Sequence, residues 1–373
     1  MAISFLLAAA VFSLAFSNGA NDNFKGVATL RRSRHYRFWR AASWATAWTA
    51  LGSLAGIWFA QKLLPVFSGA ALIQPGVSAH RFLLAVAAGA AVTVFVAVKI
   101  GMPISTTHAL TGALTGVAVV SAGWSNFQPG VLATTAFLPL LFTPLLAMTL
   151  TRCTFPLLQK VFPVARDCVC VTSAAQLAPA MIVGTEALAL PRPGSHSNRV
   201  LPAVRVDSSA ACAVHSPQAH WRANINEIIH WLSGGLISFS RGMNDTPKIA
   251  ALLLLPGLGG SLWTAFLGVA LAMAMGGMLA VRGVAKTLSE DVTDITPVEG
   301  TGANLVTAAL VTLASPLGLA VSTTHISVGS ILGIGLAQRN RTNWSKVREI
   351  LYSWLFTLPV GALLGSAVFW LWQ

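Results

Sequence analysis

The chain has 373 residues, of which 55% are hydrophobic and only 9% are charged, and its mean hydropathy is +0.69. Soluble globular proteins carry about 25% charged residues, so the charge here is too sparse to cover a soluble surface. The formal net charge of +13 raises the alternative of a nucleic-acid partner. The basic residues, however, lie in loops between apolar runs, as they do in the cytoplasmic loops of membrane proteins. We therefore expect a polytopic membrane protein that contacts the lipid bilayer and binds no nucleic acid.

Apolar runs long enough to cross a bilayer recur in two groups of five. Residues 151–225 separate the groups and hold seven Lys or Arg and seven Pro. The sequence therefore predicts an all-α fold with an N-terminal membrane repeat (1–150), a cytoplasmic linker or subdomain (151–225) and a C-terminal membrane repeat (226–373). Residues 1–17 lack the basic start of a signal peptide and are expected to stay as part of the first helix. The predicted spans are 2–30, 41–64, 82–99, 102–121, 130–150, 226–255, 261–281, 302–318, 320–338 and 350–371.

The distribution of positive charge predicts the topology. Nineteen of the 24 Lys and Arg residues fall in stretches that we assign to the cytoplasm, and the proposed outer loops hold almost none. The positive-inside rule then predicts a plasma (inner) membrane protein with both chain ends outside. Since each half has an odd number of spans, the halves form an inverted repeat, as in many secondary transporters. Whether 102–121 and 320–338 cross fully or re-enter as hairpins stays open.

One polar stretch occurs twice inside the apolar segments: SNGANDNFK at 17–25 and SRGMNDTPK at 240–248. A carboxylate within hydrocarbon is costly unless it is paired, so each Asp needs a cation. Aspartate and asparagine oxygens, with backbone carbonyls freed where Gly breaks the helix, suit sodium or a proton. The alternative is that each Asp pairs only with the Lys three residues on, which shares its helix face. The candidate cation ligands are Asn21, Asp22, Asn244 and Asp245, with Asp22 and Asp245 as the sodium ligands if sodium is the coupling ion.

A second motif also occurs twice, as PISTTH at 103–108 and AVSTTH at 320–325. Hydroxyl groups at a helix start stand beside free backbone N–H groups and the positive end of the helix, which together form an anion site. Ordinary helix N-capping by Ser or Thr is the alternative. The candidate substrate ligands are Ser105, Thr106, Thr107, Ser322, Thr323 and Thr324, together with Asn21 and Asn244.

Five further residues are candidate modulators of this site. A buried neutral imidazole can donate to an oxyanion or orient a loop, and a histidine follows each hydroxyl run. Arg241 pairs with an anionic substrate if it lies deep in the membrane, or obeys the positive-inside rule if it lies near the surface. The modulators are His108, His325, Lys25, Lys248 and Arg241.

The doubled motifs NGAND at 18–22 and RGMNDTPK at 241–248, with the two STTH segments, resemble the PiT-type inorganic phosphate transporter (phosphate permease) family. The stretch ITPVEG at 295–300 resembles that family too. The resemblance implies uptake of inorganic phosphate coupled to sodium or protons, by alternating access. It also implies that the two motifs carry the phosphate and cation ligands.

Three positions depart from the family pattern. Ala320 replaces the proline common before the second STTH segment. The second span ends IWFAQK at 57–62 without the carboxylate that some members carry. Lys25 and Lys248 stand where small residues are common, and these extra lysines can change the coupling or the substrate.

The sequence indicates a transporter and not an enzyme. It shows no Walker loop and no hydrolase motif, and we expect no cofactor beyond the coupling ion. Two alternatives remain: a permease for sulfate or another tetrahedral oxyanion, and a transporter-like membrane sensor that uses the 151–225 loop. The many Gly and Ala residues fit helix packing within the chain and homo-oligomer contacts equally well.

Overall fold

The computed structural model describes residues 2–32, 35–70, 72–73, 76–124, 127, 129–161, 167–173, 202–208, 221–254, 261–290, 295–338 and 342–372. The chain divides into two compact units. One unit comprises residues 1–161 and 230–373, and the other comprises residues 162–229. Both predicted membrane halves thus lie within a single unit.

The membrane unit is helical, as predicted, and a helix is present at each of the ten predicted spans. Within the described residues, five helical stretches, counted together with adjoining 3-10 or π turns, are long and apolar enough to cross a membrane. They are Ala2–Gly26, Ala79–Ile100, Ala133–Lys160, Leu262–Leu279 and Trp344–Leu371. The helices of the first half are α1 (Ala2–Asp22), α2 (Phe38–Phe59), α3 (Leu63–Phe67), α4 (Ala79–Ile100), α5 (Thr106–Ala122), α6 (Gly130–Leu132) and α7 (Leu138–Val161). Those of the second half are α9 (Ile225–Ala250), α10 (Leu262–Leu279), α11 (Arg282–Glu290), α12 (Pro297–Ala314), α13 (Thr323–Ala337) and α14 (Trp344–Leu371).

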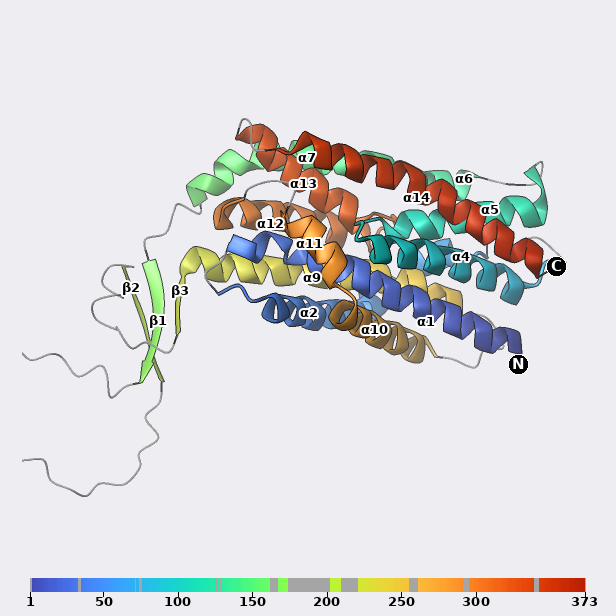
Figure 1. Cartoon of the computed structure of the whole chain (residues 1–373), viewed down its shortest axis with the longest axis horizontal. Helices are drawn as coiled ribbons and strands as arrows, with labels where there is room; N and C mark the ends of the chain where they lie inside the picture. Colours follow the sequence, from blue (N-terminus) through green and yellow to red (C-terminus); the bar gives the residue numbers. More distant parts are fainter. Residues whose placement is uncertain are drawn as a thin grey trace, which may run out of the picture. The chain divides into compact units, whose positions relative to one another are not determined.

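The two STTH segments lie at the turns of two helical hairpins. Helices α5 and α13 have 17 and 15 residues, and at 1.5 Å per residue each is shorter than the hydrocarbon core, which is about 30 Å thick. Figure 1 shows α4 and α5 in the half of the bundle nearer the two chain ends, and α12 and α13 in the other half. The turns therefore lie in the middle of the bundle. The positions of the two turns favour the re-entrant alternative over a full span for α5 and α13.

Small residues bring helices of the two halves into backbone contact. A Cβ on Gly19 of α1 would lie 1.9 Å from the Met273 carbonyl oxygen of α10. In the same way, a Cβ on Gly242 of α9 would lie 2.1 Å from the Thr49 carbonyl oxygen of α2. These glycines permit close helix approach. The expectation that they break the helix is wrong, because α1 and α9 run through them without interruption.

Each half also supplies a helix that packs on the hairpin of the other half. A Cβ on Gly112 of α5 would lie 2.1 Å from the Leu358 carbonyl oxygen of α14. Likewise, a Cβ on its counterpart, Gly329 of α13, would lie 2.4 Å from the Pro144 carbonyl oxygen of α7. The same pair of contacts thus occurs in both halves, and the halves are interlocked through their hairpins.

The second unit contains a small antiparallel sheet that the all-α expectation did not include. Its strands, β1 (Asp167–Ser173), β2 (Pro202–Ser208) and β3 (Trp221–Asn224), lie in the order β2-β1-β3. Valine alternates with other residues along β1 and β2, so that Val169 pairs with Val206 and Val171 with Val204. β-Branched side chains at every second position favour strands. The all-α prediction thus holds for the membrane unit only.

The glycine contacts predict that a single methyl group at Gly19 or Gly242 destabilises the membrane unit. Each Ala variant must push a helix backbone away, and overpacking of this kind costs about 1–3 kcal/mol. Thermal unfolding of the protein in detergent, followed by size-exclusion chromatography, measures the loss. Gly130→Ala is the control, because nothing lies within 4 Å of its Cβ position. Equal stability of Gly19→Ala and Gly130→Ala would contradict the close packing.

Candidate functional site

The two re-entrant helices begin in the same way, deep in the bundle. Ser105 and Ser322 are the N-cap residues of α5 and α13, and their hydroxyl oxygens accept from the backbone N–H of His108 (3.1 Å) and His325 (3.3 Å). Capping is therefore one role of these serines. It leaves the N–H groups of the first helical residues without an intrahelical acceptor, next to the positive helix end. Two buried helix N-termini of this kind form an anion-binding environment.

The Asn-Asp pairs lie against the extended segments that precede these helices. The Asn21 amide donates to the Ile104 carbonyl at 2.8 Å and accepts from the Ile104 N–H at 3.3 Å. In the second half, Asn244 donates to the Val321 carbonyl at 3.2 Å. The carbonyls that converge on the site thus come from the hairpin turns. We had expected them from helix breaks at the glycines.

Each lysine of the motif pairs with the aspartate three residues before it. Lys25 forms an ion pair with Asp22, and Lys248 forms one with Asp245 at 3.2 Å. All four side chains are buried. The predicted alternative of Asp–Lys pairing is thus present in both halves. The pairs are not the only contacts of the carboxylates, because Asn21 also donates to Asp22.

Beyond its aspartate, each lysine contacts both hairpins: a backbone carbonyl of its own half and a threonine hydroxyl of the other half. Lys25 donates to the Ile104 carbonyl at 2.9 Å and to the Thr324 hydroxyl. Lys248 donates to the Val321 carbonyl at 2.7 Å and to the Thr107 hydroxyl at 2.8 Å. Each ammonium group therefore contacts a carboxylate, a backbone carbonyl and a threonine hydroxyl.

Asn18 joins the two halves into one cluster. Its amide donates to Asp22 at 3.2 Å, to Thr106 at 3.0 Å and to Asp245 of the other half at 3.4 Å. We did not single out Asn18 from the sequence as a ligand. The available signal was its position in the repeat, where it is the counterpart of Arg241.

Arg241 lies inside the protein, with only 2% of its surface exposed. One guanidinium nitrogen, Nη2, donates to the Thr49 hydroxyl at 3.0 Å. The other two, Nε and Nη1, have no hydrogen-bond partner within the described part of the chain. The guanidinium also interacts electrostatically with both Asp22 and Asp245. The deep position fits the substrate-pairing interpretation and not a surface charge.

The formal charges of this cluster add up to an excess of positive charge. Two aspartates face two lysines and one arginine, which gives a net charge of +1 among buried side chains. Buried charges need partners. The two unpartnered nitrogens of Arg241 therefore mark a place where an anion gains hydrogen bonds that the protein itself does not supply.

The two histidines hold the helices in place. Their rings lie 4.3 Å apart in an edge-to-face contact. His108 Nδ1 contacts the Trp354 carbonyl of α14 at 3.2 Å, and His325 Nδ1 contacts the Leu140 carbonyl of α7 at 3.3 Å. A carbonyl only accepts, so both Nδ1 atoms carry the hydrogen. These contacts favour the loop-orienting role for both residues.

Glu299, in the ITPVEG stretch, is buried, since only 3% of its surface is exposed. Together with Thr296 it forms a capping box at the start of α12: the Thr296 N–H donates to its carboxylate at 2.7 Å. Pro297 stands in the first helical turn. The ITPVEG stretch therefore begins the second hairpin, and Glu299 serves there as a helix-capping residue.

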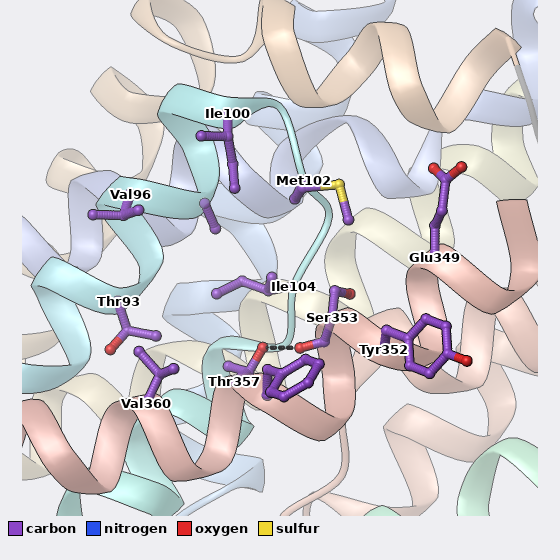
Figure 2. Close-up of a pocket in the computed structure, with 12 residues that line it drawn as sticks. Thr93, Val96, Ile100, Met102, Ile104, Glu349, Tyr352, Ser353, Thr357 and Val360 are labelled. Carbon is purple, nitrogen blue, oxygen red and sulfur yellow. Dashed lines mark hydrogen bonds between the residues drawn. The ribbon is translucent and has the colours of Figure 1, made fainter.

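A separate cavity of about 420 Å³ lies between α4 and α14. Figure 2 shows Val96, Ile100, Met102 and Val360 facing it, with Glu349 at one side. Among its lining residues, Glu349 carries the only full charge, and that charge is negative. That carboxylate is paired with Lys346 at 2.9 Å, and the lining residues include no Lys, Arg or His that could bind an anion. We therefore place the candidate site at the charged cluster and not here.

Comparison with known proteins identifies the family. Residues 18–365 match the profile of the phosphate transporter family. A probable low-affinity inorganic phosphate transporter of Rhizobium meliloti (strain 1021) is 26% identical over 97% of this chain and 93% of its own length. The chloroplastic inorganic phosphate transporter 2-1 of Arabidopsis thaliana is 36% identical, over 38% of this chain and 26% of that protein.

A solved structure shares the fold. The chain matches a structure described as the sodium-dependent phosphate transporter with a TM-score of 0.76 and 21% identity, over 100% of this chain and 99% of the other. The helical bundle described above is thus the fold of that transporter, and the apolar helices make this a multi-pass membrane protein. The chain belongs to the phosphate transporter family.

Proposed function

We propose that the protein is a secondary active transporter that carries inorganic phosphate together with a cation, sodium or a proton, by alternating access. The observation that carries the proposal is the buried cluster at the meeting point of α5 and α13. It combines two helix N-termini, a net positive charge and an arginine with two nitrogens that have no hydrogen-bond partner among the described residues. The family of the chain supports phosphate as the anion.

Phosphate fits this cluster because the donors converge on it from several directions. Free N–H groups at a helix start and a guanidinium both donate to tetrahedral oxyanions. Ser105, Thr106, Ser322 and Thr323 stand at the starts of α5 and α13 and are buried. We assign these hydroxyls and Arg241 to phosphate. Thr107, Thr324 and the Asn-Asp pairs we assign to the cation positions, because the lysine ammonium groups already bind there.

The paired contacts of the two halves support alternating access through an inverted repeat. Helix α1 runs away from the end of the bundle that holds the chain ends, and α9 runs toward it (Figure 1). Each hairpin enters from a different end and is held by a helix of the other half. Rocking of one half against the other would expose the central site to one side at a time. We propose the plasma (inner) membrane as the location, with both chain ends outside.

Replacement of Arg241 tests the phosphate assignment. Arg241→Gln is expected to lower the affinity for phosphate by about tenfold or more, since a charge-assisted hydrogen bond contributes about 1.5–3 kcal/mol. Uptake of labelled phosphate into liposomes over a range of concentrations measures the change in KM. Arg81→Gln, which removes an exposed arginine, is the matched control. Unchanged KM in Arg241→Gln would remove Arg241 from the site.

Removal of either carboxylate tests the cation position. Asp22→Asn and Asp245→Asn each leave a buried lysine without its counter-charge, which costs roughly 3–5 kcal/mol. We expect loss of phosphate uptake in both variants, together with a lower unfolding temperature. Uptake that persists at the wild-type rate would overturn the mechanism. Excess unlabelled sulfate in the same assay separates the alternatives: strong competition would favour a general oxyanion permease over a phosphate transporter.

A further inference from the structure

We propose that the ammonium groups of Lys25 and Lys248 are built-in cations that occupy the two cation positions of the site, so that phosphate binding requires no sodium. The inference rests on the proposed function and decides between the two coupling ions that it leaves open. It is carried by the oxygen atoms around the two ammonium groups.

The ligand set of each lysine is that of a cation site. Lys248 Nζ contacts a carboxylate oxygen at 3.2 Å, a backbone carbonyl at 2.7 Å and a threonine hydroxyl at 2.8 Å. Lys25 Nζ contacts the same three kinds of oxygen, from Asp22, Ile104 and Thr324. Carboxylates, freed backbone carbonyls and hydroxyls are the oxygens from which proteins build sodium sites in membranes. In this protein an ammonium group holds them.

The ammonium groups are saturated by these contacts. A lysine ammonium has three N–H donors and no acceptor, and each Nζ meets three acceptors. The side chains are 4% and 1% exposed for Lys25 and Lys248, so water does not compete for these donors. A sodium ion on the same oxygens would lie beside a positive charge in a site of low dielectric, where the repulsion is strong. The lysines therefore exclude sodium from both positions.

Both lysines also perform the connecting role expected of a bound cation. Lys25 extends from the end of α1 to Thr324 at the start of α13, and Lys248 extends from α9 to Thr107 at the start of α5. Each thus joins a motif of one half to the hairpin of the other. A free cation at this place would do so only when bound, whereas a tethered ammonium does so all the time.

The charge balance of the cluster also determines how the anion binds. With each Asp neutralised by its own Lys, the positive charge of Arg241 remains for the substrate. A site that depends on sodium gains this positive charge only when the ion arrives. In the present cluster it is permanent, so we expect the anion to bind without a preceding cation. Of the two coupling ions, the proton then remains.

Two kinds of substitution separate a cation position from a simple structural ion pair. Lys25→Ala and Lys248→Ala remove the ammonium group and leave room for an ion among the carboxylate, carbonyl and hydroxyl oxygens that surrounded it. Lys25→Met and Lys248→Met remove the charge and fill the same space with an apolar chain. Sodium can therefore replace the lysine in the Ala variants and not in the Met variants.

The first measurement is phosphate binding to the purified full-length protein in sodium and in N-methylglucamine, at fixed pH and ionic strength. We expect equal affinity of the wild type in both media. In the Ala variants we expect weak binding in N-methylglucamine and recovery by about tenfold in sodium, within the usual range of coupling between two ligands. A wild-type affinity that falls by about tenfold without sodium would overturn the inference.

The second measurement needs no phosphate. Sodium should raise the unfolding temperature of the Ala variants, and it should leave the wild type and the Met variants unchanged, because ligand binding to the folded state stabilises it. Ala variants that are equally unstable in both media would show a structural ion pair only and would overturn the inference. If the wild type binds no phosphate in either medium, the proposed function fails, and the sodium-dependent unfolding still decides the role of the lysines.

Discussion

The site depends on two backbone carbonyl groups, those of Ile104 and Val321, at the turns of the two hairpins. Non-helical backbone at membrane depth is tolerated only where its polar groups are satisfied by the protein or by a water-filled cavity. The Ile104 oxygen accepts from Asn21, Lys25 and Thr324. The Val321 oxygen accepts from their counterparts in the repeat, Asn244, Lys248 and Thr107. The residues that solve this backbone problem are the same residues that define the site. The hydrogen bonds that stabilise the two turns are therefore the same ones that assemble the candidate site.

Much of this arrangement was predictable from the sequence because the polar motifs occur twice within apolar surroundings. A buried Asp is costly and needs a partner, and the Lys three residues on lies on the same helix face. The Asp–Lys pairs, which were the alternative to a cation site, follow from these two facts. A helix at each of the ten predicted spans was predictable from hydropathy. The short lengths of α5 and α13 explain why the sequence left open whether these segments cross the membrane fully or re-enter. Seventeen residues is close to the limit for a membrane span.

The remaining features depend on tertiary contacts that periodicity does not encode. The contact of Lys25 with Thr324 joins residues that lie 299 positions apart in the sequence. The composition of either motif by itself does not predict it. Glu299 is buried where it forms a capping box with Thr296 at the start of α12, a contact that the local pattern of charge does not indicate. The sheet in residues 162–229 was missed since its strands are short and the loop around them is rich in Pro and charge. The local sequence pattern thus predicted the membrane helices, whereas the contacts between the two halves became visible only in the structure.

Where the halves differ, the difference has a chemical consequence. Most contacts of one half recur in the other, but Asn18 in α1 corresponds to Arg241 in α9. The neutral amide of Asn18 connects both aspartates, whereas the guanidinium retains two unpartnered nitrogens. A fully symmetric site would carry either no excess charge or twice as much. One asymmetric arginine leaves a single positive charge among these buried side chains. Under the function that we propose, one charge would bind an anion without making its release prohibitively costly, and a transporter must release its substrate in every cycle.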